Sequence, residues 1–283
     1  MSTTDLTLHE AADDLGVHYM TAYRYVRLGV LPAVKEGGSW RVRRSDLDAF
    51  RSGTATTPVK AGRPAPWAER LESRLMAGDS RGAWGVVEAA LAAGAELDEI
   101  YLDVLSPALI AIGSKWEAGE IDIAIEHRAT GIASRLIGRL GPRFVRRGRT
   151  KGTVVLGAPA GENHGLPTAI LGDLLRLEGW EVSDLGADTP ASSFALTAID
   201  TDDVVAVGLS VTYREHLASC AAACAAVRAA APGVLVVVGG IAVDGPAHAI
   251  ELGAHHHAGS AKELVRLLDE FTTGAPVSGL AGA

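Results

Sequence analysis

Five short apolar runs alternate with helical repeats in the C-terminal half of the chain. The runs cover residues 153–157, 181–185, 204–210, 234–239 and about 254–258, and the helical stretches between them cover about 167–178, 190–199, 214–230 and 245–252, with a last one from Ser260. Continuous valine-rich runs are typical of parallel strands that are buried on both faces. The pattern predicts a flavodoxin-like, doubly wound parallel sheet over residues 150–275.

Residues 67–149 have a helical pattern that is interrupted at Gly78-Asp79, at Gly94 and near Gly119. In the third stretch, apolar residues with 3-4-3-4 spacing mark one helix face: Leu102, Leu105, Leu109, Ile112 and Trp116. A further helix, starting near Glu126-His127, is predicted to bury Ile132, Ala133, Leu136 and Leu140. Four helices of this size predict a small antiparallel four-helix bundle.

Residues 1–53 show a third pattern. Thr7-Leu8-His9-Glu10 has the spacing of a helix capping box, and a second helix is expected from about Tyr19 to Leu28. An alternating stretch that reverses at Glu36-Gly37-Gly38 predicts a β-hairpin wing, and Ser45-Asp46-Leu47-Asp48 caps a last short helix. The order is that of a helix-turn-helix followed by a wing.

Composition adds the domain count and the charge. A chain of 283 residues is long for one core, so two or three domains are expected, joined by a Pro-rich linker at 54–66 and followed by a tail at 276–283. The formal net charge is -8, yet residues 17–51 hold seven basic residues against three acidic ones. No stretch is typical of a signal peptide or a membrane span, so we expect a cytoplasmic protein.

The local positive charge favours DNA as a partner. Arginines on the second helix suit base edges or phosphates in a major groove, and those on or after the wing suit the DNA backbone. The candidate DNA-binding residues are Tyr19, Thr21, Tyr23, Arg24, Arg27, Arg41, Arg43 and Arg44. The alternative is a protein-binding module with a solvated basic face. The stretch from Leu6 to Phe50 resembles the winged helix-turn-helix of the MerR and excisionase DNA-binding families, most specifically in its Gly37-Gly38-Ser39-Trp40-Arg41-Val42 wing.

The loop after the first predicted strand holds the candidate ligand site. Gly161-Glu162-Asn163-His164-Gly165-Leu166-Pro167 lies between a strand and a helix, and such loops line the carboxyl edge of a parallel sheet, where ligands bind. A metal-ligating His164 would need an acceptor such as Glu162 to fix its tautomer. A lone histidine in such a loop is more often a surface residue. No Walker sequence and no Gly-x-Gly-x-x-Gly follows the strand, so nucleotide binding has no support.

Three landmarks of this domain resemble those of base-off, His-on cobalamin-binding domains. The stretch from Glu162 to Pro167 is similar to their Asp-x-His-x-x-Gly motif, while Ser210-Val211-Thr212 and Gly239-Gly240 follow the third and fourth strands. The resemblance implies that His164 is the lower axial ligand to cobalt and Glu162 its orienting partner, with the other landmarks near the displaced nucleotide tail. The cofactor-binding residues implied are Glu162, Asn163, His164, Gly165, Leu166, Ser210, Val211, Thr212, Gly239 and Gly240.

Trp116, nine intervening residues and then Glu126-His127 resemble the Trp-x9-Glu-His signature of light-responsive cobalamin-binding regulators of the CarH type. In that family the bundle lies over the upper face of the cobalamin, and these residues line the pocket for its adenosyl group. Taken alone, Trp116 is more often a core anchor than a ligand contact. The resemblance implies adenosylcobalamin as cofactor, operator DNA as partner, and a homo-oligomer, either a dimer or a tetramer.

Three positions depart from the family pattern. Pro167 stands where the motif has Gly, which the first turn of a helix tolerates while the tail channel narrows. Thr212 replaces a Leu and adds a hydroxyl near the tail. Glu117 follows Trp116 where well-studied CarH-type photoreceptors have a His that caps cobalt after light removes the adenosyl group. A carboxylate is a poor substitute for imidazole on cobalt.

Other features favour structural interpretations. Cys220 and Cys224, four apart on an Ala-rich helix, are predicted to be small core residues. His255-His256-His257 place at most two side chains on one side of a strand, so a metal site there is not favoured. A basic joint between bundle and sheet is interpreted as a solvated linker; its residues are Arg143, Arg146, Arg147, Arg149 and Lys151.

We therefore predict a non-enzymatic transcriptional regulator with a winged helix, a four-helix bundle and a flavodoxin-like sheet. The first hypothesis is a light-responsive repressor that holds adenosylcobalamin through His164. The second is a light-independent sensor of cobalamin or of another tetrapyrrole, which Glu117 favours. The third is a corrinoid carrier for methyl transfer, and the winged helix counts against it because such a carrier has no need of operator DNA.

Overall fold

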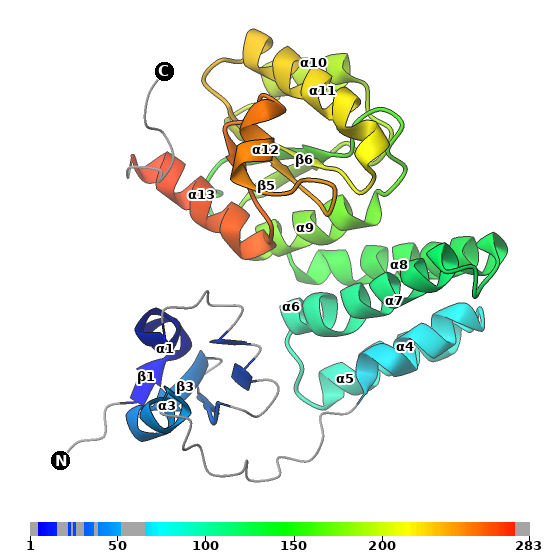
Figure 1. Cartoon of the computed structure of the whole chain (residues 1–283), viewed down its shortest axis with the longest axis vertical. Helices are drawn as coiled ribbons and strands as arrows, with labels where there is room; N and C mark the ends of the chain where they lie inside the picture. Colours follow the sequence, from blue (N-terminus) through cyan, green and yellow to red (C-terminus); the bar gives the residue numbers. More distant parts are fainter. Residues whose placement is uncertain are drawn as a thin grey trace. The chain divides into compact units, whose positions relative to one another are not determined.

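The computed structural model describes residues 5–15, 22–23, 25–26, 31–36, 39–51 and 66–274, and the chain divides into two compact units, Met1–Pro66 and Trp67–Ala283. Each unit has its own sheet (Figure 1). Several predicted features lie outside the described residues: most of the second helix, the Gly37-Gly38 turn, nearly all of the 54–66 linker and the 276–283 tail.

The first unit contains a three-stranded antiparallel sheet in the order β1-β3-β2. Its elements are β1 (Asp5–Thr7), α1 (Leu8–Leu15), β2 (Val34–Glu36), β3 (Ser39–Arg43) and α3 (Arg44–Arg51). The β2–β3 pairing confirms the predicted hairpin. The capping box is also confirmed, since the Thr7 N–H donates to Glu10 Oε2 at 2.7 Å and the Glu10 N–H donates to Thr7 Oγ1 at 3.2 Å. The pattern missed β1, because three residues are too few to show alternation.

Four helical stretches form the bundle of the second unit. They are α4 (Trp67–Met76), α5 (Ser80–Ala92), a composite of α6 (Leu97–Glu99), the π-helical η1 (Ile100–Leu105) and α7 (Ser106–Glu117), and lastly α8 (Ile123–Leu140). Gly78, Gly94 and Gly119 follow three of these helix ends with φ of 72°, 93° and 70°, which confirms the predicted interruptions. The predicted start of the last helix was three residues late, because Asp122 caps it by accepting from the Ala124 N–H at 2.7 Å.

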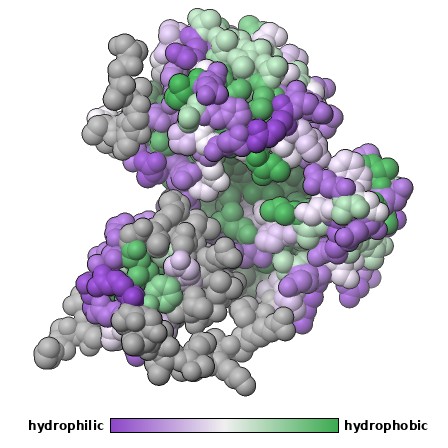
Figure 2. Space-filling model, viewed as in Figure 1, coloured by the Kyte–Doolittle hydropathy of each residue, from purple (hydrophilic) through white to green (hydrophobic). Residues whose placement is uncertain are grey.

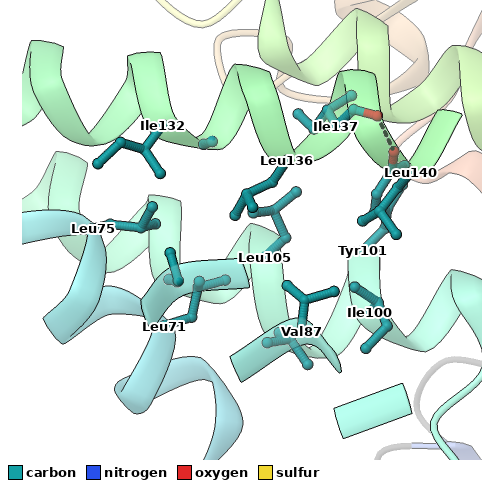
Figure 3. Packing of buried hydrophobic residues seen from close by; sticks show 14 of the residues in the cluster. Leu71, Leu75, Val87, Ile100, Tyr101, Leu105, Ile132, Leu136, Ile137 and Leu140 are labelled. Carbon is teal, nitrogen blue, oxygen red and sulfur yellow. Dashed lines mark hydrogen bonds between the residues drawn. The ribbon is translucent and has the colours of Figure 1, made fainter. Parts of the chain in front are cut away.

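Apolar side chains from all four stretches meet inside the bundle (Figure 3). The predicted core residues of α8 are all buried: Ile132, Ala133, Leu136 and Leu140. On the third stretch only Leu105 and Ile112 of the predicted face are buried, whereas Leu102, Leu109 and Trp116 are half-buried. The prediction assumed an unbroken α-helix, but the π-helical turn η1 shifts the face and turns Tyr101 inward.

The C-terminal part of the second unit confirms the predicted doubly wound sheet. All strands are parallel, in the order β5-β4-β6-β7-β8. The strands are β4 (Thr153–Gly157), β5 (Glu181–Asp184), β6 (Val204–Ser210), β7 (Leu235–Gly239) and β8 (His256–His257). The helices are η2 (Gly141–Arg143), α9 (Leu166–Leu177), α10 (Ala191–Asp200), η3 (Arg214–His216), α11 (Leu217–Ala230), α12 (Pro246–Glu251) and α13 (Ala261–Thr273).

Helices cover both faces of this sheet, as Figure 1 shows. Val154 of β4 packs with α9 and α13, while its neighbour Val155 packs with α10, α11 and α12 on the opposite face. Cys220 and Cys224 are free and fully buried in the second of these layers, which confirms the prediction of core residues. No helix in the described part of the chain is long and apolar enough to cross a lipid bilayer.

Helix α9 joins the sheet to the bundle. Its Leu175 packs with the sheet and its Leu174 packs with the bundle core. Beside it, the Tyr101 hydroxyl donates a 2.7 Å hydrogen bond to Asp173 Oδ2, and Arg176 donates to Asp173 Oδ1 at 2.9 Å. Apolar side chains are visible in the recess where bundle and sheet meet (Figure 2). The two parts of the second unit therefore share an apolar joint with a buried polar link.

Candidate functional site

The loop between β4 and α9 places an imidazole beside a buried carboxylate. His164 Nδ1 lies 2.5 Å from Glu162 Oε1. The His164 side chain is 41% exposed, whereas that of Glu162 is fully buried. A carboxylate accepts hydrogen bonds and does not donate, so Nδ1 carries the proton in this contact. In the neutral imidazole with this tautomer, the other ring nitrogen, Nε2, has the lone pair, and the ring is open to a ligand.

The carboxylate of Glu162 is held by donors on both of its oxygens. Oε2 accepts from the backbone N–H groups of Thr212 and Tyr213 at 2.8 and 3.1 Å, and Oε1 also accepts from the His164 N–H at 3.2 Å. Burial alone raises the pKa of Glu162, but the hydrogen bonds from His164, Thr212 and Tyr213 outweigh it and lower the pKa below its usual value. Glu162 is thus a fixed anion that orients His164.

Two further contacts fix the loop itself. Asp188, on the loop after β5, accepts from the Gly161 N–H at 2.7 Å, and its own N–H donates to the Glu162 carbonyl at 2.8 Å. Gly161 has a φ of 88°, and a Cβ there would lie 2.9 Å from a ring nitrogen of His216. Only glycine suits both the backbone and the close contact. The histidine is therefore presented by a loop that is braced from both neighbouring strand ends.

The other two sequence landmarks lie along the same carboxyl edge. Ser210 ends β6, and Gly239 ends the adjacent β7, so the Ser210-Val211-Thr212 and Gly239-Gly240 stretches are neighbours. The glycines allow close contacts within the protein: a Cβ on Gly240 would lie 2.2 Å from the Val211 carbonyl oxygen, and one on Gly239 would lie 2.5 Å from that of Ala258. The close packing of the backbone therefore explains why both positions are glycine, whether or not a ligand binds there.

Tyr213 lies between the His164 loop and the charged residues of the bundle. Its ring meets the His164 ring edge-on, with centroids 5.1 Å apart and an interplanar angle of 68°. Burial raises the pKa of Tyr213, and the negative charges of Glu117, Glu162 and Glu126 raise it further. Glu117 and Glu126 belong to the bundle, so the end of α7 and the start of α8 lie within electrostatic range of the edge of the sheet.

The three bundle residues predicted to line the upper face of a ligand differ in how deeply they are buried. Trp116 is half-buried and lies outside the buried bundle core, so its indole does not act as a core anchor. Glu126 is 23% exposed and accepts a 2.7 Å hydrogen bond from the Thr130 hydroxyl. The His127 side chain is 73% exposed, with Nε2 3.7 Å from Glu126 Oε2. Trp116 and Glu126 thus have the partial burial of pocket-lining residues, and His127 does not.

In the first unit, the strand β3 separates core from surface residues. Val42 is buried and Trp40 half-buried against the core, so Arg41 and Arg43 lie on the opposite side of the strand. Arg44 pairs with Asp14 at 3.0 Å, which reduces its availability to DNA. Tyr23 packs partly against the core of this unit. The other predicted DNA-binding residues lie outside the described part of the chain: Tyr19, Thr21, Arg24 and Arg27.

Comparisons with known proteins agree with this arrangement. Residues 67–140 and 152–268 each match a family described as B12 binding domain, and residues 6–54 match one described as helix-turn-helix domain. The chain is 29% identical over 274 residues to the HTH-type transcriptional repressor CarA of Myxococcus xanthus, covering 84% of this chain and 87% of that protein. The chain therefore combines two B12 binding domains with a helix-turn-helix domain and is similar to a cobalamin-binding transcriptional regulator over most of its length.

Two corrinoid proteins are similar to part of the chain. Trimethylamine corrinoid protein 1 of Methanosarcina acetivorans is 30% identical over 112 residues, which cover 38% of this chain and 52% of that protein. The structure of the monomethylamine corrinoid protein of Methanosarcina barkeri has a TM-score of 0.63 at 20% identity, and the match covers 71% of this chain and 95% of that one. The second of these matches concerns the fold alone.

Sequence reasoning missed two residues that shape the candidate site. Tyr213 and Asp188 belong to no motif that the sequence showed, yet Tyr213 contacts His164 and Asp188 braces its loop. Tyr213 directly follows the Ser210-Val211-Thr212 landmark, and its position on a strand-end loop was the available signal. Among the described residues, no group of three or more His, Cys, Asp or Glu side chains could hold a metal ion, so the three consecutive histidines do not form such a site.

Proposed function

We propose that this protein is a cobalamin-dependent transcriptional regulator in which His164 Nε2 is the lower axial ligand to cobalt. The observation that carries the proposal is the 2.5 Å contact between His164 Nδ1 and the buried carboxylate of Glu162. It fixes the tautomer that leaves Nε2 free, and metal-ligating histidines use such carboxylate partners. Supporting it, the donor set around Glu162 keeps that partner ionised.

The upper side of the ligand would be bordered by the bundle. Trp116 and Glu126, with His127 next to them, would cover the adenosyl group, and Asn163, Gly165 and Leu166 would border the lower face. When bound, adenosylcobalamin supplies a cobalt–carbon bond that light breaks. In this proposal, Glu162 orients the axial His164, and the bundle residues exclude water from the adenosyl group. The half-buried indole of Trp116 supports this assignment, because it packs outside the bundle core.

The regulatory output would be repression through operator DNA. The winged helix would read the operator, with Arg41 and Arg43 on the side of β3 that faces away from the core. A ligand with different affinity for two assembly states shifts the balance between them, so bound cofactor would favour one homo-oligomer, a dimer or a tetramer, on DNA. The helix-turn-helix match and the repressor relative support a regulator without enzymatic activity.

A second candidate is a sensor of cobalamin, or of another tetrapyrrole, that does not respond to light. Glu117 favours it, because this carboxylate lies within electrostatic range of Tyr213 at the place where an imidazole would be needed to cap cobalt after photolysis. A corrinoid carrier for methyl transfer is the third candidate. The two similar corrinoid proteins favour it only for the second unit. A methyl carrier does not need a DNA-binding helix-turn-helix, which the first unit matches.

The proposal is tested by mixing the purified chain with adenosylcobalamin in the dark and recording absorbance, oligomer size and affinity for promoter DNA. The three measurements are repeated after green light. We expect bound cobalamin with a histidine-ligated spectrum, an oligomer in the dark and loss of DNA affinity in the light. His164→Ala should lose the spectrum, and His9→Ala, which removes an exposed histidine of the first unit, should keep it.

The outcomes separate the candidates. No cobalamin binding, or His164→Ala with an unchanged spectrum, would disprove the ligand assignment. Binding with no change of size or DNA affinity in light would leave the light-independent sensor. Cobalamin binding without any affinity for DNA, together with methyl transfer from a methylated corrinoid, would support the carrier.

A further inference from the structure

The segment that joins the bundle to the sheet concentrates positive charge. Residues 143–151, called here the basic segment, hold five basic residues and no acidic one: Arg143, Arg146, Arg147, Arg149 and Lys151. All five side chains are exposed. The chain as a whole has a formal net charge of -8, so the basic segment stands out from an acidic background. A local excess of like charge attracts oppositely charged partners.

Three arginines of the basic segment have no carboxylate partner among the described residues. Lys151 is engaged, because its Nζ lies 2.8 Å from Asp269 Oδ1 and 5.5 Å from the centre of the Trp180 ring. By contrast, no carboxylate in the described part of the chain pairs with Arg146, Arg147 or Arg149. These three guanidinium groups are therefore open to an external anion.

The basic segment is separate from the candidate cobalamin site. It ends just before Thr153, the first residue of β4, and it borders Glu181, the first residue of β5. Strands β4 and β5 are parallel, so both of these residues lie at the amino edge of the sheet. His164 follows the carboxyl end of β4, at the opposite edge. Any ligand of the basic segment thus binds apart from the cofactor.

The surroundings favour a large polyanion over a small one. A pocket of about 330 Å³ lies beside the segment, but Glu178 and Glu181 line it together with Arg146, Arg147 and Arg149. The other two cations of its lining, Lys151 and Arg176, are already paired with Asp269 and Asp173. A small phosphate compound inside the pocket would face two carboxylates. A polyanion that lies across the exposed arginines would not enter the pocket and would avoid those carboxylates. Duplex DNA carries one negative charge per about 1.7 Å of its axis, which suits closely spaced arginines.

We propose that Arg146, Arg147 and Arg149 contact the phosphate backbone of DNA and form a second, sequence-independent DNA contact. The inference rests on the proposed DNA-binding function of the first unit and extends it to the second. Residues 52–65 connect the two units covalently, so DNA held by the first unit has a raised effective concentration at the second. Under that condition, even a weak electrostatic contact contributes to the affinity of the full chain.

The test uses the full-length protein and a fluorescent DNA duplex of scrambled sequence, with affinity measured over a series of salt concentrations. Each phosphate contact contributes about 0.9 to the slope of log affinity against log salt. Arg146→Gln/Arg147→Gln should therefore lower that slope by about 1.8 and weaken binding at ~0.1 M salt by up to about eightfold per arginine. Arg146→Lys/Arg147→Lys keeps the charge and should keep the wild-type slope.

The matched control is Arg81→Gln/Arg135→Gln, which removes the same charge from two exposed arginines of the bundle. This control should bind DNA as the wild type does. The inference is wrong if Arg146→Gln/Arg147→Gln keeps the wild-type slope, or if the control loses as much. It is also wrong if the pair change abolishes binding of inorganic pyrophosphate but leaves DNA binding intact. A wild type that binds no DNA at all would overturn the proposed function as well.

Discussion

Glu162→Gln tests whether a carboxylate sets the tautomer of His164. Every described contact of the Glu162 side chain is with a donor: Oε1 meets His164 N and Nδ1 at 3.2 and 2.5 Å, and Oε2 meets the N–H groups of Thr212 and Tyr213 at 2.8 and 3.1 Å. Glutamine keeps the shape but replaces one oxygen with an NH2 group, which cannot accept. One pair of donors therefore faces another donor, whichever way the amide lies.

The two orientations of the amide differ in cost. If its NH2 group faces Thr212 and Tyr213, two hydrogen bonds to a charged group are lost, at roughly 1.5–3 kcal/mol each. If it faces His164 instead, Nδ1 becomes an acceptor and the ring proton moves to Nε2. The second orientation is cheaper, and it removes the lone pair that would bind cobalt. We therefore expect cobalamin affinity to fall by about 10- to 100-fold, the usual effect of losing such a partner.

The assay is a titration of the variant with cobalamin in the dark, with absorbance reporting both the affinity and the lower ligand. Glu215→Gln is the matched control, since it removes the same charge from η3, after the neighbouring strand β6, with a side chain that is 75% exposed and has no contact with His164 among the described interactions. The control should behave as the wild type. Unchanged affinity and spectrum in Glu162→Gln would refute the tautomer argument.

Three further changes test the framework. Gly240→Ala places a Cβ 2.2 Å from the Val211 carbonyl oxygen at a φ of 96°, so urea unfolding should show a loss of roughly 2–5 kcal/mol. Tyr101→Phe removes the 2.7 Å hydrogen bond to buried Asp173 and should cost about 1.5–3 kcal/mol in the same assay. Burial lowers the pKa of His256, so folding favours its neutral form. The free energy of unfolding should therefore fall as the pH drops below about 6.5, the pKa of an unfolded histidine.

Each of these predictions can be refuted by a specific result. Gly233→Ala, with no atom within 4 Å of the added Cβ, is the control for Gly240→Ala, and equal stability of the two would refute the clash. Tyr101→Phe with wild-type stability would mean that Asp173 finds another donor. For the pH series, His256→Gln should show a smaller fall below pH 6.5 than the wild type. An identical fall would assign the effect to other groups.

The large elements of the second unit could be predicted because their signals are local. Valine runs such as Val204–Ser210 mark strands buried on both faces, and right-handed crossovers then leave few possible strand orders. In the bundle, Gly78, Gly94 and Gly119 break the helical pattern and mark helix ends. The His164 loop could be placed at the carboxyl edge for the same reason, since it follows the first strand of such a sheet.

The links between distant segments could not be predicted. Tyr101 and Asp173 are 72 residues apart, and their hydrogen bond requires the π-helical turn that changes which face of the third helical stretch is buried. Glu162 is held by the backbone N–H groups of Thr212 and Tyr213. Every residue except proline supplies such a group, so no residue type signals this contact in the sequence.

The two sides of the candidate site differ in how their charge is balanced. On the sheet side, the carboxylate of Glu162 accepts hydrogen bonds from His164 and from the backbone N–H groups of Thr212 and Tyr213, which balance its negative charge. On the bundle side, the negative charges of Glu117 and Glu126 raise the pKa of Tyr213, so these two carboxylates act electrostatically on a residue that contacts His164. Glu117 therefore does more than remove an imidazole from the family pattern. In the proposed site, its negative charge would favour a positively charged group over a neutral one at the upper face.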